Sequence, residues 1–233
     1  MMITVIRDLA QELQQKPHLD KPQVIFFDAM GTLFGLRATV GEIYAAIAVS
    51  FGVTVDISAL NAAFLDIFRA SPPLAFGESD LSQLQPLEFD WWQAIAAQSF
   101  EKIGALEQFE DFTAYFQLLY DHFATAQPWF IYEDVIPCLN YWQNQNVELG
   151  IISNFDSRLH HLLIALELEN YFQSVTLSSA SQTAKPETPI FQQALAKHRS
   201  QPHQAWHIGD SFREDYQGAE RAGLKAFLIE RPG

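Results

Sequence analysis

The chain has few of the residues that mark a secreted or membrane protein. Its only cysteine, Cys138, excludes an intrachain disulfide and indicates a reducing compartment. No apolar run is long enough to cross a bilayer, and the N-terminus has neither the basic nor the apolar region of a signal peptide. These absences predict a soluble, cytoplasmic protein that does not associate with membranes.

Positive charge is also scarce. The chain has 14 lysines and arginines against 28 aspartates and glutamates, which gives a formal net charge of -14. Because proteins bind nucleic acids largely by neutralising phosphates with basic side chains, we expect no nucleic-acid partner. The same charge repels anionic substrates, so a site for an anion would need a local cation or a bound metal.

What the chain does contain is an alternation of strand and helix patterns. With 233 residues, 48% of them apolar, it can bury one sizeable core. Strands are predicted at 24–27, 147–152, 174–177, 205–208 and 226–229, and helices at 133–145, 157–166, 186–198 and 212–222. This alternation predicts an α/β fold built on a doubly wound parallel sheet.

One long block, residues 37–128, breaks the alternation because it contains no strand pattern. Helical patterns fill it instead, at 40–51, 57–70, 86–103 and 109–125. We therefore predict a core formed by residues 1–36 and 129–233, with an all-helical insertion at 37–128. Residues 1–22 read as a short amphipathic helix and a linker.

A tryptophan pair lies in the third of these helical patterns. We expect one ring of Trp91 and Trp92 to pack inside the helical block and the other at its boundary with the core. The alternative is that one of the two rings lines a substrate site.

Asp28 follows directly on the apolar run from Val24 to Phe27, and Gly31 and Thr32 end that run. Four β-branched or aromatic residues in a row are typical of a buried parallel strand. Ligands of open α/β sheets bind at the carboxyl ends of the strands, so Asp28 is a candidate site residue. The alternative is an aspartate that only begins a turn.

Three later segments place further polar groups in similar positions. The strand at 147–152 ends in Ser153 and Asn154, which can donate hydrogen bonds to an anion. Lys185 precedes Pro186, a residue well suited to open a helix, so we expect the lysine near a helix N-terminus. The strand at 205–208 ends in Gly209 and Asp210, followed by Asp215; Asp210 alone could equally cap a helix.

These four motifs, in this order and strand context, resemble those of the haloacid dehalogenase-like hydrolases. The stretches 32–44 and 152–159 look like subfamily IA of that superfamily. The resemblance covers nearly the whole chain after about residue 22. It implies a Rossmann-like core with central strand order 5-4-1-2-3 and a helical cap that closes over the site to exclude water and select the substrate.

The resemblance also implies roles for individual residues. Asp28 would be the nucleophile of a phosphatase that acts on a small phosphorylated metabolite, with Mg²⁺ as cofactor. The metal ligands would be Asp28, the carbonyl of Met30 and Asp210. The phosphate would be bound by Ala29, Met30, Ser153, Asn154 and Lys185, with Thr32 and Asp215 supporting these groups from behind.

Met30 departs from the family pattern. Phosphatases of this family normally carry a second aspartate two residues beyond the nucleophile, which protonates the leaving oxygen and then activates water. A thioether can do neither, and loss of a positioned acid or base typically lowers the rate about 10²–10⁴-fold. Either the chain is a slow phosphatase, or its substrates leave without protonation, or another group supplies the proton, or catalysis has been lost.

Two other functions fit some of the motifs. A phosphate-binding protein without turnover would keep the same anion and metal groups. A dehalogenase also lacks the second aspartate, but Asp210 counts against it, because a carboxylate beside the nucleophile would repel a carboxylate substrate.

Overall fold

The computed structural model describes residues 5–13, 21–76 and 80–231. Within these residues one sheet contains six strands, in the order β1-β8-β7-β2-β5-β6, and all its pairings are parallel. The strands are β1 (Val5–Ile6), β2 (Val24–Phe27), β5 (Glu148–Ser153), β6 (Ser174–Leu177), β7 (Ala205–Gly209) and β8 (Lys225–Ile229). The five strands from β2 onward have the order 5-4-1-2-3, as the resemblance implies.

The N-terminal segment differs in part from its prediction. It contains a short helix, α1 (Leu9–Glu12), but also β1, which pairs with β8 at one end of the sheet. Two residues are too short a run for an alternation pattern to reveal a strand. The predicted linker falls partly at 14–20, outside the described residues.

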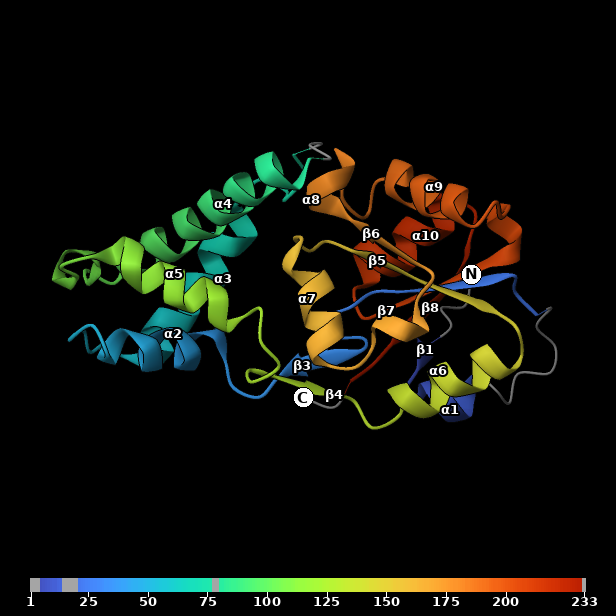
Figure 1. Ribbon diagram of the computed structural model, residues 1–233, viewed down its shortest axis with the longest axis horizontal. Helices are drawn as coiled ribbons and strands as arrows, with labels where there is room; N and C mark the ends of the chain where they lie inside the picture. Colours follow the sequence, from blue (N-terminus) through green and yellow to red (C-terminus); the bar gives the residue numbers. More distant parts are fainter. Residues whose placement is uncertain (1–4, 14–20, 77–79, 232–233) are drawn as a thin grey trace.

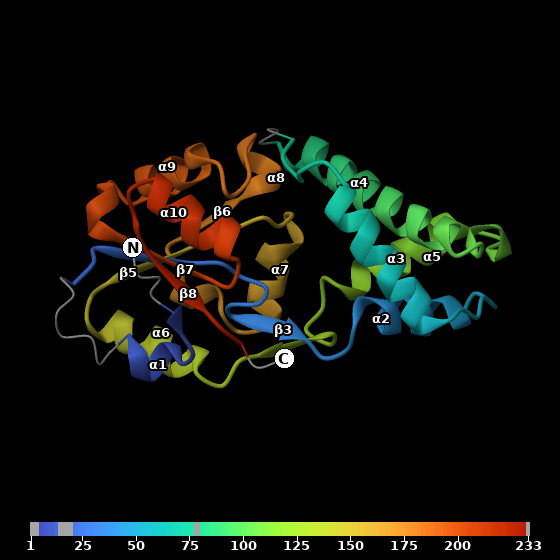
Figure 2. The ribbon, with the colours of Figure 1, turned by 180° about the vertical axis from the view of Figure 1, so that it is seen from behind.

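Alternate residues of the central strand point to opposite faces of the sheet, and helices cover both faces (Figures 1 and 2). Ile25 and Phe27 pack with α1, α6 (Val135–Asn144) and α7 (Arg158–Ala165). Val24 and Phe26 pack with α9 (Thr188–Lys197) and α10 (Gln217–Arg221) on the other face. The sheet is therefore doubly wound, and its central strand is fully buried.

The predicted helical block forms a separate group beside the sheet, at the left of Figure 1. It consists of α2 (Val40–Val49), α3 (Ile57–Ala70), α4 (Leu81–Lys102), η1 (Leu106–Gln108) and α5 (Phe112–His122), which share one apolar cluster. Helix α4 begins five residues before its predicted start, because Asp80 caps it and Pro86 is accommodated inside it.

Two short strands that the sequence did not reveal connect this block to the sheet. β3 (Phe34–Leu36) pairs antiparallel with β4 (Trp129–Ile131). The predicted limits of the insertion, residues 37 and 128, lie directly beyond these strands.

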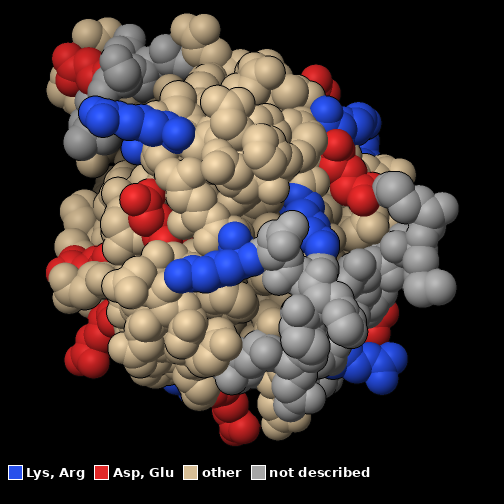
Figure 3. Space-filling model, turned by 90° about the vertical axis from the view of Figure 1, so that its right-hand side faces the viewer, with Lys and Arg blue, Asp and Glu red and all other residues tan. Residues whose placement is uncertain are grey.

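Within the described part of the chain, no helix has the length and apolarity needed to cross a bilayer. On the face shown in Figure 3, acidic and basic side chains are interspersed among uncharged residues. The lysines and arginines visible there do not merge into a continuous basic patch.

Candidate active site

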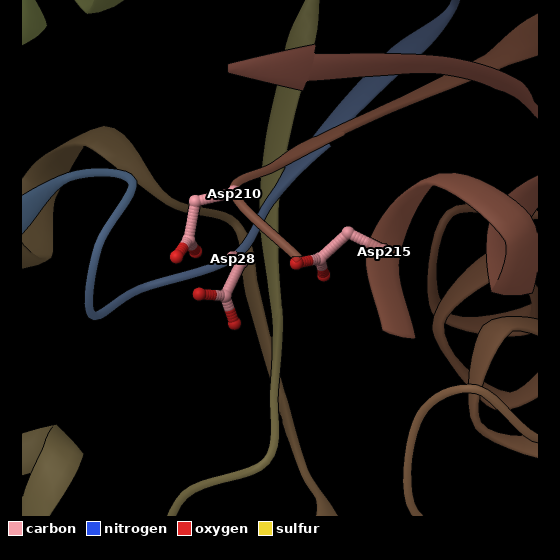
Figure 4. A group of neighbouring side chains, drawn as sticks. All are labelled: Asp28, Asp210 and Asp215. Atoms are coloured by element: carbon pink, nitrogen blue, oxygen red, sulfur yellow. The ribbon is translucent and has the colours of Figure 1, made fainter. Parts of the chain in front are cut away.

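Three aspartates meet at the carboxyl edge of the sheet (Figure 4). Asp28 follows β2 and Asp210 follows β7, and these neighbouring strands are in register through Phe27 and Ile208. Asp215 reaches the same point from the turn after β7. One oxygen of each carboxylate lies within 4.8 Å of the others, close enough to hold a single metal ion.

Lys185 neutralises part of this charge. Its Nζ lies 2.6 Å from Oδ1 of Asp28 and 2.5 Å from Oδ1 of Asp215, and its side chain is 1% exposed. Burial works against a charged amine, but Asp215 and Asp28 outweigh it and raise the pKa of Lys185. The lysine is therefore protonated and shared by two carboxylates.

The position of Lys185 is held differently from the prediction. Pro186 does not open a helix: α9 begins at Thr188, and Lys185 lies in the preceding loop, before a cis peptide bond. Instead, the Asn154 side chain holds the backbone of Lys185. Oδ1 of Asn154 accepts from the lysine N–H at 2.8 Å, and Nδ2 donates to the lysine carbonyl at 2.9 Å.

Ser153 and Glu214 complete this side of the site. Ser153 is buried, and its Oγ donates to Oδ1 of Asp28 at 3.1 Å. Nδ2 of Asn154 also donates to Oε2 of Glu214 at 3.2 Å. The sequence prediction did not include Glu214, although its place next to Asp215 could have pointed to it.

Asp215 is the second carboxylate that Lys185 binds. It is buried, and it accepts hydrogen bonds from Nε2 of His207 at 2.9 Å and from the N–H of Ser211 at 3.0 Å. Burial opposes its ionisation, but Lys185 and His207 lower the pKa of Asp215. A Cβ on Gly209 would lie 2.1 Å from Cγ of Asp215, so the carboxyl group needs a glycine at that position.

His207 is a second residue that the sequence prediction missed. It lies inside β7, fully buried, and burial lowers its pKa, so it is neutral and donates from Nε2. Its place two residues before the glycine at the strand tip put it on a strand, but no sequence signal indicated its contact with Asp215.

Asp210 faces solvent beside the buried pair. Ser211, and not Asp210, caps the following π-helical turn, Phe212–Tyr216, so the interpretation of Asp210 as a helix cap is wrong. Partial desolvation by the surrounding protein raises the pKa of Asp210 to about 7, and the negative charges of Asp28 and Asp215 contribute to this rise. Oγ1 of Thr32 donates to Oδ1 of Asp210 at 3.3 Å.

The turn after Asp28 brings Met30 and Gly31 to the site. Ala29 is buried, whereas the Met30 side chain is 45% exposed. Gly31 has φ +86°, and a Cβ there would lie 2.5 Å from Oδ2 of Asp210. The turn thus requires glycine both for its backbone conformation and for the close approach of the carboxylate.

The donor set fits a magnesium ion. The three aspartates, when ionised, carry three negative charges, and Lys185 neutralises one of them. The carboxylate oxygens that remain are the kind of ligand that Mg²⁺ prefers. Burial raises the pKa of Asp28, against the opposing effect of Lys185, and Asp215 raises it further. Excess like charge of this kind is relieved by a divalent cation.

The sequence matches a known family over most of its length. The model of a haloacid dehalogenase-like hydrolase matches residues 22–223. The chain belongs to this family of hydrolases. Haloacid dehalogenase-like hydrolase domain-containing protein 3 of Xenopus laevis is 32% identical over 207 residues, which cover 89% of this chain and 84% of that protein.

Solved structures of other haloacid dehalogenase-like proteins show the same fold. A phosphatase from Thermococcus onnurineus matches with a TM-score of 0.61 and 22% identity, covering 91% of this chain and 87% of its own. The hydrolase YfnB of Bacillus subtilis, described as bound to magnesium, matches with a TM-score of 0.66 and 17% identity, covering 90% and 89%.

The structure brings the predicted residues of this hydrolase together. Asp28, Ser153 and Lys185 are linked by hydrogen bonds, and Asp210 and Asp215 lie beside them. The four motif residues Asp28, Ser153, Lys185 and Asp210 therefore lie in one site. The roles of the individual residues remain predictions.

Proposed function

We propose that this hydrolase is a magnesium-dependent phosphatase that acts on a small phosphorylated metabolite through an aspartyl-phosphate on Asp28. The observation that carries the proposal is the buried Asp28 carboxylate, bonded to Lys185 and Ser153 and lying beside Asp210. Support comes from the related fold of a phosphatase and from a second relative that binds magnesium.

Asp28, the Met30 carbonyl and Asp210 would hold the magnesium ion, which when bound would screen the carboxylates from the phosphoryl oxygens. Lys185 would neutralise the phosphoryl group and keep Asp28 ionised. Ser153, Asn154 and the N–H groups of Ala29 and Met30 would orient the phosphate, while Thr32 and Asp215 would fix the positions of Asp210 and Lys185.

In the first step an oxygen of Asp28 forms a bond to phosphorus, and the bond from phosphorus to the leaving oxygen breaks. In the second step the oxygen of water forms a bond to phosphorus, the bond from phosphorus to Asp28 breaks, and inorganic phosphate leaves while the released proton passes to solvent. Met30 cannot give a proton to the leaving oxygen, so the reaction favours acyl and aryl phosphates, whose leaving groups are stable anions. We also propose that residues 37–128 act as a cap over the site.

The test is hydrolysis of p-nitrophenyl phosphate and acetyl phosphate with and without magnesium. We expect turnover that requires magnesium and disappears in Asp28→Asn, because an amide is not a nucleophile here. Asp121→Asn, an exposed aspartate of α5, is the matched control and should retain activity. Trapping of a phosphoryl group on wild-type protein, detected by mass spectrometry, would identify the intermediate.

A second candidate function is phosphate binding without turnover. It is favoured by the exposed Met30, whose thioether cannot donate a proton. If the chain binds phosphate and magnesium but no substrate turns over, it acts as a phosphate-binding regulatory protein. Activity that survives in Asp28→Asn would contradict the phosphatase, because the nucleophile would then lie elsewhere.

A further inference from the structure

Glu88, on helix α4 of the helical block, bonds to the core of the protein. Its side chain is fully buried. Oε1 accepts from the N–H of Ser157 at 2.8 Å, and Oε2 accepts from the Ser157 hydroxyl. Ser157 precedes helix α7, and its own side chain does not cap that helix. A carboxylate from α4 therefore occupies the N-terminus of α7, where negative charge is favoured.

One helical turn further along α4, Trp92 makes a second bond to the same segment. Its Nε1 donates to Oδ2 of Asp156 at 2.8 Å. This confirms the prediction that one of the two tryptophans lies at the boundary with the core. Trp91 instead donates to the carbonyl of Pro72, before α4.

Asp156 joins this contact to α5. The fully buried carboxylate also binds Arg158, with Nε at 2.8 Å and Nη2 at 2.7 Å. Arg158 in turn donates from Nη1 to the carbonyl of Tyr120 at 3.1 Å, and its guanidinium lies 3.7 Å from the centre of the Tyr120 ring. Two helices of the block thus hold residues 156–158.

The segment that these helices hold is the continuation of the candidate phosphate site. Residues 153–158 run without interruption from Ser153, which is bonded to Asp28, and Asn154, which holds the Lys185 loop, to Asp156 and Ser157. One end of a six-residue segment is fixed by the site and the other by α4. A shift of α4 would act directly on both buried anchors, Asp156 and Ser157.

We propose that Glu88 and Trp92 are positioning residues that link the seating of α4 to the binding of phosphate at Ser153 and Asn154. Each event favours the other, because a phosphate orders the first half of the segment and the α4 contacts order the second half. The phosphate part of this inference rests on the proposed function; the link itself does not require turnover.

The test compares Glu88→Gln and Trp92→Phe with matched controls on the same helix. Asp90→Asn changes an exposed acid two residues from Glu88, and Trp91→Phe removes an indole N–H that bonds within the helical block. Binding of inorganic phosphate in magnesium chloride is measured by calorimetry. Hydrogen exchange of residues 84–92 and 153–158 is followed with and without phosphate.

In the wild type and both controls, phosphate should slow exchange in α4 as well as at 153–158. In Glu88→Gln and Trp92→Phe the effect on α4 should disappear, and phosphate affinity should fall about 5-fold or more, the range usual for coupled sites. If Glu88→Gln does not fold, the comparison of Trp92→Phe with Trp91→Phe carries the test.

Wild-type phosphate affinity in the two variants, with faster exchange at 153–158, would overturn the link and leave a purely structural contact. Absence of phosphate binding by the wild type would overturn it as well. Loss of coupling in the variants, in a protein that hydrolyses nothing, would support the link while contradicting the phosphatase.

Discussion

At the scale of single residues, the site depends on one lysine shared by two carboxylates. Lys185 lies between Asp28 and Asp215, and all three side chains are nearly or fully buried. Buried charges of this kind persist only when paired, because an unpaired one is strongly destabilising. Lys185 therefore offsets the charge of both carboxylates, and loss of one partner would leave buried charge unpaired at this edge of the sheet.

The strand-tip residues were predictable because the carboxyl ends of parallel strands meet at one edge. The residues that hold them in place were not predictable in this way. His207 could be placed on a strand, but nothing in its neighbours indicates that its ring turns toward Asp215. The role of Glu88 was even harder to predict, because its partner Ser157 lies 69 residues away in the sequence. A helical pattern does not indicate which element packs against a given face of the helix.

Met30 gives the sharpest prediction at this scale. Met30→Asp should restore a proton donor and raise turnover of alkyl phosphates, which expel a poor leaving group, by up to about 10²–10⁴-fold. Aryl phosphates should gain far less, because their leaving groups need no proton. The measurement is kcat/KM for a sugar phosphate and for p-nitrophenyl phosphate in both proteins.

Met30→Leu serves as the control, since it changes the side chain without adding a carboxyl group. Equal gains for both substrates would show that protonation of the leaving group does not limit this enzyme. Stability in the absence of magnesium should fall, because a further carboxyl near Asp28 and Asp210 adds like charge.

At the scale of elements, the turn between β5 and α7 connects the candidate site to the helical block. The sequence predicted this strand and this helix within about one residue, but not that the turn between them is bonded to two helices of the block. The reason is physical: period and propensity report which face of an element is apolar, whereas the Asp156–Arg158 pair reports contacts made only after the helices pack.

This pair makes a pH-dependent contribution to stability. Burial opposes ionisation, but the Arg158 guanidinium lowers the pKa of Asp156 below its ordinary 3.8. A lowered pKa in the folded state means that folding favours the ionised form. The stabilisation is therefore complete above pH 3.8 and is lost as the pH falls through the lower, folded-state pKa.

Asp156→Asn should accordingly destabilise the protein by about 3–5 kcal/mol near neutral pH, because Arg158 is left buried without its partner. The difference from wild type should shrink once the pH drops below 3.8. Urea unfolding between pH 7 and pH 3 measures both effects. Asp66→Asn, from an exposed pair with Lys102, should change little, and a difference that grew in acid would contradict this assignment.

At the scale of the whole molecule, the family resemblance implied the order of the central strands, and the helical pattern at 37–128 indicated the helical block. β1 was indicated by neither, because its identity as a strand depends on its partner: Val5 and Ile6 pair with Leu228 and Ile229, more than two hundred residues away. A two-residue run carries no pattern of its own, so only the folded sheet defines it.

That pairing has a consequence for how copies of the protein meet. β8 is apolar over Ala226 to Ile229, and β1 pairs with Leu228 and Ile229 on the side that would otherwise present unpaired N–H and C=O groups there. An uncovered strand of this kind is a template for the strand of another molecule. β1 thus shields part of a strand edge at which two molecules could pair.

Removal of residues 1–13 should therefore promote concentration-dependent self-association, measured by light scattering after gel filtration. Removal of residues 1–4 alone, which leaves Val5 and Ile6 in place, should not. Leu9→Ala thins the core beneath α1 but keeps β1, so it should lower the melting temperature without association. If Leu9→Ala associated as strongly as the deletion, loss of core packing rather than the exposed strand edge would be the cause. Association of the deletion alone would mean that Val5 and Ile6 keep this hydrolase from pairing with a second copy of itself.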